Sequence, residues 1–348
     1  MGLSDQAATN TEPIAGDETA AATREAAGAA PERAEPRRTP ALGDPPGPIA
    51  PGDSFGEAGR KAMWPHAQRL LRFERSLGDA TKADDLKRYR VATRRLRAAL
   101  RLFGDAYPDA KARALRDALG ELGRAAGTVR DLDVRIADLG SWVSEQGEEA
   151  AAHVRPLHGA WQSERDHAAA DLLSRIRTRR HARLLRDVVA FADGRVRHTA
   201  DGRRAVRDTA ASRIWRAFEN LREQGSLVRW ADLPAMHDVR IDAKRLRYSL
   251  EFLGDVLPPG PAWLVERLVR LQDHLGAIND AATVAAAARV VLLDRGRSLT
   301  AVERGAIARY AACRDRDVAR LRRGVGRPWR SIASAGFARR LGRTVVID

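Results

Sequence analysis

An internal repeat with an offset of about 150 residues is the feature that most constrains the fold of this chain. Residues 90–97 (RVATRRLR) match residues 240–247 (RIDAKRLR) at an offset of 150. Further pairs keep this offset within one residue: Trp64/Trp215, Leu100/Leu250, Gly104/Gly254, Pro108/Pro258, Leu122/Leu271, Gly127/Gly276 and Asp131/Asp280. So steady an offset over roughly seventy residues predicts two equivalent structural units related by a pseudo-twofold axis.

The units are predicted to be helical. Apolar residues recur at helical spacing from Phe55 to about Val325, interrupted by short turns that contain Gly, Asp and Pro. Only 5% of the residues are aromatic, whereas Ala, Leu and Arg are abundant, and this bias disfavours β-structure. We expect an all-α fold with two bundles of about four helices each, in residues 55–205 and 206–325.

The two ends of the chain differ from the helical region in composition. Residues 1–54 hold eight of the sixteen prolines and almost no large apolar side chain. We expect them to form a disordered acidic tail, because they cannot bury enough surface to offset their ordering entropy. Residues 326–348 form a basic C-terminal tail that carries Trp329 and Phe337.

The charge is distributed unevenly. The formal net charge is +15, and residues 1–54, with nine acids and four arginines, carry −5, so the other 294 residues carry +20. This excess predicts an anionic partner for the folded part.

A stripe of cations runs along each copy of the repeat. Placed on a helix, residues 86–103 put Tyr89, Ala92, Leu96, Ala99 and Phe103 on one apolar face. Lys87, Arg90, Arg94, Arg97 and Arg101 step identically on the opposite face, over about 21 Å. In the second copy the corresponding cations are His237, Arg240, Lys244 and Arg247, and Glu251 stands where the first has Arg101.

Charged residues opposite an apolar face are also the ordinary solvated surface of a helix. Such a surface intersperses acids that neutralise its cations. Here Asp85 is the only acid among residues 85–103, against seven cations. The like charges repel one another, and their recurrence in both copies indicates a surface that an anionic ligand neutralises.

Enzymatic and metal chemistry find little support. The chain has no GxxxxGK[ST] loop and no GxSxG elbow, so we expect no catalytic residues and no cofactor. Its single cysteine, Cys313, cannot form an internal disulfide or a thiolate metal site. His237, His274, Asp273 and Asp280 are the alternative metal-binding set, but they lack a recognised ligand spacing, and no metal site is predicted.

The location is predicted from two further features. The longest apolar run, Ala281–Leu293, is thirteen residues long and contains Arg289, so no membrane span is predicted. The N-terminus has neither the basic region nor the apolar core of a secretory signal. We therefore expect a cytoplasmic protein, whose oligomeric state the sequence does not define.

Two motifs resemble those of the CHAD family, the conserved histidine α-helical domain. Residues 237–248 (HDVRIDAKRLRY) resemble its signature, and residues 271–280 (LQDHLGAIND) resemble its second motif. Residues 90–103 and 127–134 are similar to the matching first-repeat motifs, with Lys87 in place of the first-repeat histidine. The resemblance covers roughly residues 55–325.

This resemblance implies two antiparallel helical bundles with a basic concave surface or pore, binding of inorganic polyphosphate, association with polyphosphate granules, and no catalysis. The implied polyphosphate-binding residues are Lys87, Arg90, Arg94, Arg95, Arg97, Arg101, His237, Arg240, Lys244, Arg245, Arg247 and Tyr248.

Nucleic acid is the alternative partner, because a basic helix cannot by charge alone distinguish one phosphate polymer from another. The stripes lack the aromatic stacking platforms expected for RNA or single strands. No helix-turn-helix or basic arm is evident for reading duplex DNA. Nucleic acid is therefore a secondary candidate.

Overall fold

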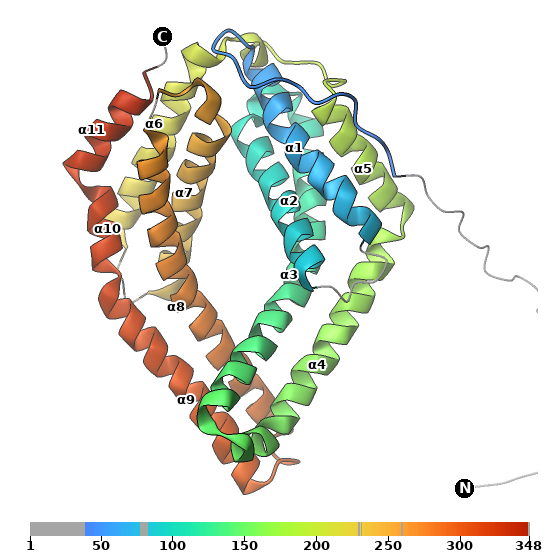
Figure 1. Cartoon of the computed structure of the whole chain (residues 1–348), viewed down its shortest axis with the longest axis vertical. Coiled ribbons are helices and arrows are strands. Elements are labelled where there is room, and N and C mark those ends of the chain that lie inside the picture. The colour runs from blue at the N-terminus through green and yellow to red at the C-terminus, as the bar shows by residue number, and fades with distance from the viewer. Residues whose placement is uncertain (1–38, 77–82, 229, 231, 259, 347–348) are drawn as a thin grey trace, which may run out of the picture. The chain divides into compact units, whose positions relative to one another are not determined.

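The fold is all-α in a computed structural model that describes residues 39–346 except 77–82, 229, 231 and 259. The compact unit comprises Thr39–Asp348. In the described residues no β-strand occurs, and a single isolated bridge joins Ser54 and Ala205. Its elements (Figure 1) are α1 (Phe55–Ser76), α2 (Ala83–Leu102), the 3₁₀ turn η2 (Gly104–Ala106), α3 (Asp109–Gln146), α4 (Glu148–Ile176), α5 (Arg179–Ala192), η3 (Asp201–Arg203), α6 (Val206–Leu227), α7 (Leu233–Phe252), η4 (Gly254–Val256), α8 (Pro261–Arg295), α9 (Ala301–Gly324), α10 (Gly326–Ala333) and α11 (Ala335–Thr344).

The repeated sequence forms the same local structure twice. Helix α2 ends at a Gly-Asp turn, η2, and Pro108 precedes α3. Helix α7 likewise ends at a Gly-Asp turn, η4, and a proline begins α8. Proline cannot continue a helix but tolerates its start, so both copies break the helix at the same repeat position and restart it within a few residues.

Two helical hairpins extend from these corners. Helix α3 has 38 residues and α8 has 35, which correspond to lengths of roughly 57 and 53 Å. Helix α3 turns back into α4 through Gly147 alone, whose φ of 91° lies in the left-handed region that favours glycine. Helix α8 packs along α9 in the same manner (Figure 1).

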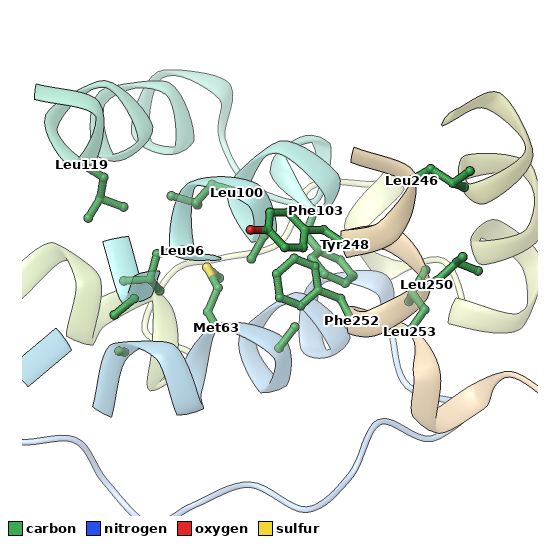
Figure 2. Close-up of a cluster of buried hydrophobic side chains, with 14 of the residues drawn as sticks. Met63, Leu96, Leu100, Phe103, Leu119, Leu246, Tyr248, Leu250, Phe252 and Leu253 are labelled. Atoms are coloured by element: carbon green, nitrogen blue, oxygen red, sulfur yellow. The ribbon is translucent and has the colours of Figure 1, made fainter. Parts of the chain in front are cut away.

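The two copies of the repeat share their cores, so the two predicted bundles are not independent. One cluster of buried side chains includes residues from α1 to α3 and from α6 to α8. Within it the Phe103 and Phe252 rings lie 6.4 Å apart, and Figure 2 shows side chains of α2 and α7 meeting in one group. A second cluster joins the far ends of α3, α4, α8 and α9 around Trp142, Trp161 and Tyr310. Among its described residues, the first copy has five α-helices, α1–α5, where about four were expected.

Part of the predicted N-terminal tail is packed on this core. Ile49 is buried, and its backbone N–H donates to Asp255 Oδ2 at 3.1 Å. Asp53 pairs with Lys61 at 2.7 Å and accepts a backbone hydrogen bond from Val206 at 2.9 Å. The prediction of a disordered tail up to Ser54 therefore does not hold for residues 39–54, because one apolar side chain and several backbone bonds attach them. Residues 1–38 of that prediction lie outside the described residues.

The predicted basic tail at residues 326–348 contains two helices, α10 and α11. Ile332, Phe337 and Leu341 are buried in the first cluster. Ser334 caps α11 by accepting the N–H of Phe337 at 3.1 Å. Three apolar side chains spaced by four and five residues are sufficient to hold this short basic segment on the core.

Helix α8 is the one helix of the described residues that is long and apolar enough to cross a membrane by length and composition. Its apolar side chains, including Leu264, Leu268, Leu271 and Leu275, are buried against neighbouring helices. A core helix passes the same test, so this is weak support for a membrane span.

Candidate anion-binding site

The two predicted stripes lie on helices that contact each other, α2 and α7. The α2 stripe consists of Lys87, Arg90, Arg94, Arg97 and Arg101, and the α7 stripe of His237, Arg240, Lys244 and Arg247. Lys87, Arg101 and His237, at the stripe ends, are exposed, and the central members are half-buried. The sequence analysis placed the stripes directly opposite the core. The structure instead recesses their centres, because α2 also packs on α3 and α7 on α8.

Three of the arginines pack against glycine positions in the neighbouring helices α3 and α8. A Cβ at Gly120 of α3 would lie 3.5 Å from Arg97 Nε, and a Cβ at Gly127 would lie 3.7 Å from Arg90 Nε. In the second copy, a Cβ at Gly276 of α8 would lie 3.5 Å from Arg240 Nε. These guanidinium groups thus lie close to helix backbone, and a Cβ at each glycine would be in van der Waals contact with them.

The centres of the two stripes converge. Burial lowers the pKa of Lys244 to about 7, and the positive charges of Arg240, Arg94, Arg247 and Arg90 lower it further. Arg94 belongs to the other stripe, and burial lowers its pKa as well, with Arg247 and Arg90 acting in the same direction. The shifts show that cations from both helices share one poorly solvated region.

Most of these cations have no acidic partner. Arg90 pairs with Asp131 of α3 at 3.2 Å, and Arg247 Nε lies 3.4 Å from Glu251 Oε1. Within the described part of the chain, no carboxylate lies within 4.0 Å of five further members, which are Arg94, Arg97, Arg101, Arg240 and Lys244.

Several polar atoms of the site are also buried without a hydrogen bond. Within the described residues, these include Nε of Arg94, Arg97 and Arg240 and the hydroxyl of Tyr248. Buried polar groups are ordinarily hydrogen-bonded, and leaving one unpaired costs about 1–3 kcal/mol. The site therefore combines unneutralised charge with unused donors, which is the chemistry of a surface for an extended anion.

Arg95 and Arg245, which were predicted with the stripes, are placed differently. Arg95 forms an ion pair with Glu251 of α7, and its Cζ lies 4.6 Å from the centroid of the Tyr248 ring. Arg245 pairs with Asp242 of its own helix at 2.5 Å. Arg95 thus joins α2 to α7. Tyr248, the remaining predicted residue, is buried, and the Cζ of Arg247 also lies 5.0 Å from its ring centroid.

One member of the alternative metal-binding set, His274, has another partner, and so do two further acids of the first-repeat motif. Asp131 pairs with Arg90, and Asp133 pairs with Arg165 at 3.1 Å. His274 Nε2 lies 2.8 Å from the backbone oxygen of Leu321 in α9. Over the described residues, no group of three or more His, Cys, Asp or Glu side chains is placed to hold a metal ion.

The sequence analysis missed two contributors to the site. One is the set of glycines against which the arginines pack, and the other is Glu251, the carboxylate at the junction of the stripes. The sequence did contain a sign of the close packing at these glycines: Gly120, Gly123 and Gly127 occur within a long helix at spacings of three and four. Each costs about 1 kcal/mol relative to alanine in a helix interior, which itself suggests a close approach.

Comparison with known proteins decides the family. The CHAD domain family model matches residues 61–289, about two thirds of the chain and both stripes. The chain belongs to the CHAD domain family. No curated protein matches the chain.

Two solved structures share the fold of this CHAD protein. PptA from Streptomyces chartreusis aligns with a TM-score of 0.67 and 18% identity, over 80% of this chain and 100% of the other. The CHAD domain from the plant Ricinus communis aligns with a TM-score of 0.63 and 22% identity, over 83% of this chain and 97% of the other. The all-α prediction and the family resemblance are thereby confirmed. The CHAD family is known for polyphosphate-related binding, and its domains are generally non-catalytic.

Proposed function

We propose that this protein binds inorganic polyphosphate, without catalysis, along the converging centres of the α2 and α7 stripes. The observation that carries the proposal is the group of cations without acidic partners, Arg94, Arg97, Arg101, Arg240 and Lys244, drawn from two helices. A linear chain of phosphates would neutralise these charges in turn. It would also accept hydrogen bonds from the terminal N–H groups of these guanidinium side chains.

The recessed position of the cations favours polyphosphate over nucleic acid. Tyr89 and Tyr248 are both buried, so neither ring offers a face on which a base could stack. A thin, flexible phosphate chain reaches half-buried arginines more readily than a rigid duplex does. In the cell, this binding would place the protein in the cytoplasm at polyphosphate granules.

The test is a salt titration of long-chain polyphosphate binding. Replacing Arg94→Gln and Arg97→Gln together should weaken binding at least tenfold and reduce the slope of log affinity against log salt by about 1–2. The matched control is Arg183→Gln with Arg186→Gln, which removes two exposed α5 arginines that have no ion pair in the described structure. The control should lose little.

Competition with duplex DNA at moderate salt completes the test. Polyphosphate should displace DNA, whereas DNA should displace polyphosphate poorly. Equal losses in both double variants would mean that binding reports diffuse surface charge. Stronger binding of DNA than of polyphosphate would favour the nucleic-acid alternative.

A further inference from the structure

A second cationic site lies at the C-terminal end of the chain. A pocket of about 400 Å³ opens between the start of α8 and the helices α10 and α11. Its lining includes Trp263, Arg267, Ser334, Arg339, Arg340 and Arg343. Most of these residues lie beyond residues 61–289, the part that the CHAD family model matches. The pocket size falls within the range of small-molecule sites.

The walls of this pocket are held by buried side chains. Phe337 and Leu341 of α11 are fully buried. The Phe337 ring stacks on Phe218 of α6 with centroids 5.6 Å apart and lies 6.0 Å from the Trp263 ring. The side chains that face the pocket are therefore carried by a helix with a fixed position on the core.

The charge of the pocket is unbalanced. Four guanidinium groups line it, and none of them has a carboxylate within 4.0 Å in the described structure. The Cζ atoms of Arg267 and Arg340 lie 5.0 and 4.9 Å from the centroid of the Trp263 ring. Nε of Arg267 is buried and has no hydrogen-bond partner among the described residues. Four like charges around one pocket repel one another, and a bound anion would relieve this repulsion.

The pocket geometry favours a particular class of anion. Arginine presents a planar set of donors that matches phosphoryl oxygens in pairs. The formal charge of the four guanidinium groups is close to that of a triphosphate at neutral pH. Trp263 is half-buried, and two guanidinium groups already lie within 5.0 Å of its ring centroid, so the ring is a poor stacking surface for a base. Recognition would therefore be restricted to the phosphates.

We propose that this pocket binds a compact anion with two or three linked phosphoryl groups, either free inorganic triphosphate or the triphosphate of a nucleotide. The site is separate from the stripes on α2 and α7 and does not depend on the function proposed for them. The chain would then have two phosphate-binding sites: this pocket for a short phosphate compound and the stripes for a long phosphate chain.

The test is calorimetry with inorganic triphosphate. The stripe variant, Arg94→Gln with Arg97→Gln, should retain a 1:1 site. In the pocket variant, Arg340→Gln with Arg343→Gln, the affinity of that site for triphosphate should fall more than tenfold. Arg183→Gln with Arg186→Gln, equal in charge change, should bind as the parent does. Arg340 and Arg343 are exposed, so the pocket variant should fold, and its helicity and melting temperature verify this.

Two further measurements keep the outcome decisive. Tryptophan fluorescence should change when triphosphate binds the parent, and Trp263→Phe should remove that change. ATP should bind with an affinity within about threefold of inorganic triphosphate, and a tenfold preference for ATP would show that the base is recognised. The proposal is overturned if the pocket variant binds triphosphate as the parent does, or if citrate binds equally well. Long-chain polyphosphate measured on the same variants reports separately on the stripes.

Discussion

Arg95 of α2 forms an ion pair with Glu251 of α7 across the junction of the two cationic stripes. Glu251 Oε1 also lies 3.4 Å from Arg247 Nε, and both arginines lie within 5.0 Å of the centroid of the Tyr248 ring. The same carboxylate is negatively charged in a site that would bind an anion. Glu251 therefore has opposite effects on stability and on binding, and the two effects can be separated.

Glu251→Gln should destabilise the protein and strengthen polyphosphate binding. The cost should be about 1–3 kcal/mol in urea unfolding, because two partly buried guanidinium groups lose their counter-charge. Affinity should rise because an anion that competes with phosphate is removed. Glu219→Gln, at an exposed pair with Arg222, is the control and should change neither property. A parallel loss of stability and affinity would contradict this view of Glu251.

Polyphosphate binding should depend on pH through Lys244. Burial and four neighbouring arginines lower the pKa of Lys244 to about 7 in the free protein. Bound phosphates favour the charged form, so a proton is taken up on binding. Affinity should rise as pH falls from about 9 to about 7 and then level off below about 6.

Lys244→Arg should flatten this profile, because a guanidinium group stays charged throughout the interval. His237→Gln is the control, since His237 lies exposed at the beginning of the α7 stripe and outside the converging centre. The measurement is the polyphosphate dissociation constant at several pH values for the parent and both variants. A profile that flattens with His237→Gln and persists with Lys244→Arg would assign the dependence to the histidine.

Truncations should distinguish two parts of the acidic N-terminal segment. Removal of residues 1–38 deletes a net charge of −3 and should leave the melting temperature unchanged. Removal of residues 1–54 also deletes Ile49 and the Asp53–Lys61 pair. It should cost about 2–4 kcal/mol and lower the melting temperature by roughly 3 °C or more. Differential scanning calorimetry checks both, and equal melting temperatures would show that residues 39–54 contribute nothing to stability.

The cluster at the far ends of the hairpins should depend on Tyr310. This fully buried residue donates its hydroxyl hydrogen to Asp138 at 2.6 Å, and Asp138 also pairs with Arg314 at 3.0 Å. Tyr310→Phe should cost about 1–2 kcal/mol in urea unfolding without altering polyphosphate affinity.

Tyr248→Phe is the matched comparison for Tyr310→Phe. The buried Tyr248 hydroxyl makes no hydrogen bond of normal geometry in the described structure and has only a looser polar contact with Arg94, so its removal should cost little stability. It should weaken polyphosphate binding, because that contact helps to orient Arg94. Equal destabilisation by the two substitutions would show that the unpaired hydroxyl has a partner in solution.

The helical class and the two stripes follow from the sequence alone. Periodicity is a local property, and cations at three- and four-residue spacing share a helix face wherever that helix packs. The 150-residue offset of the repeat predicts that α2 and α7 occupy corresponding positions in its two copies. The tails were less predictable: Ile49 and Phe337 are isolated apolar residues whose burial depends on a surface formed by other helices.

Only the tertiary structure decided which cations are free. Arg94 and Arg95 are adjacent in the sequence and chemically identical. Helix packing turns Arg95 onto Glu251 and Tyr248 and leaves Arg94 without a carboxylate partner in the described residues. Partners 156 positions apart cannot be read from local spacing, and neither can the burial that lowers the pKa of Lys244. The sequence determined where charge accumulates, and long-range packing determined which of those charges remain for a ligand, because desolvation and pairing depend on the neighbours that folding supplies.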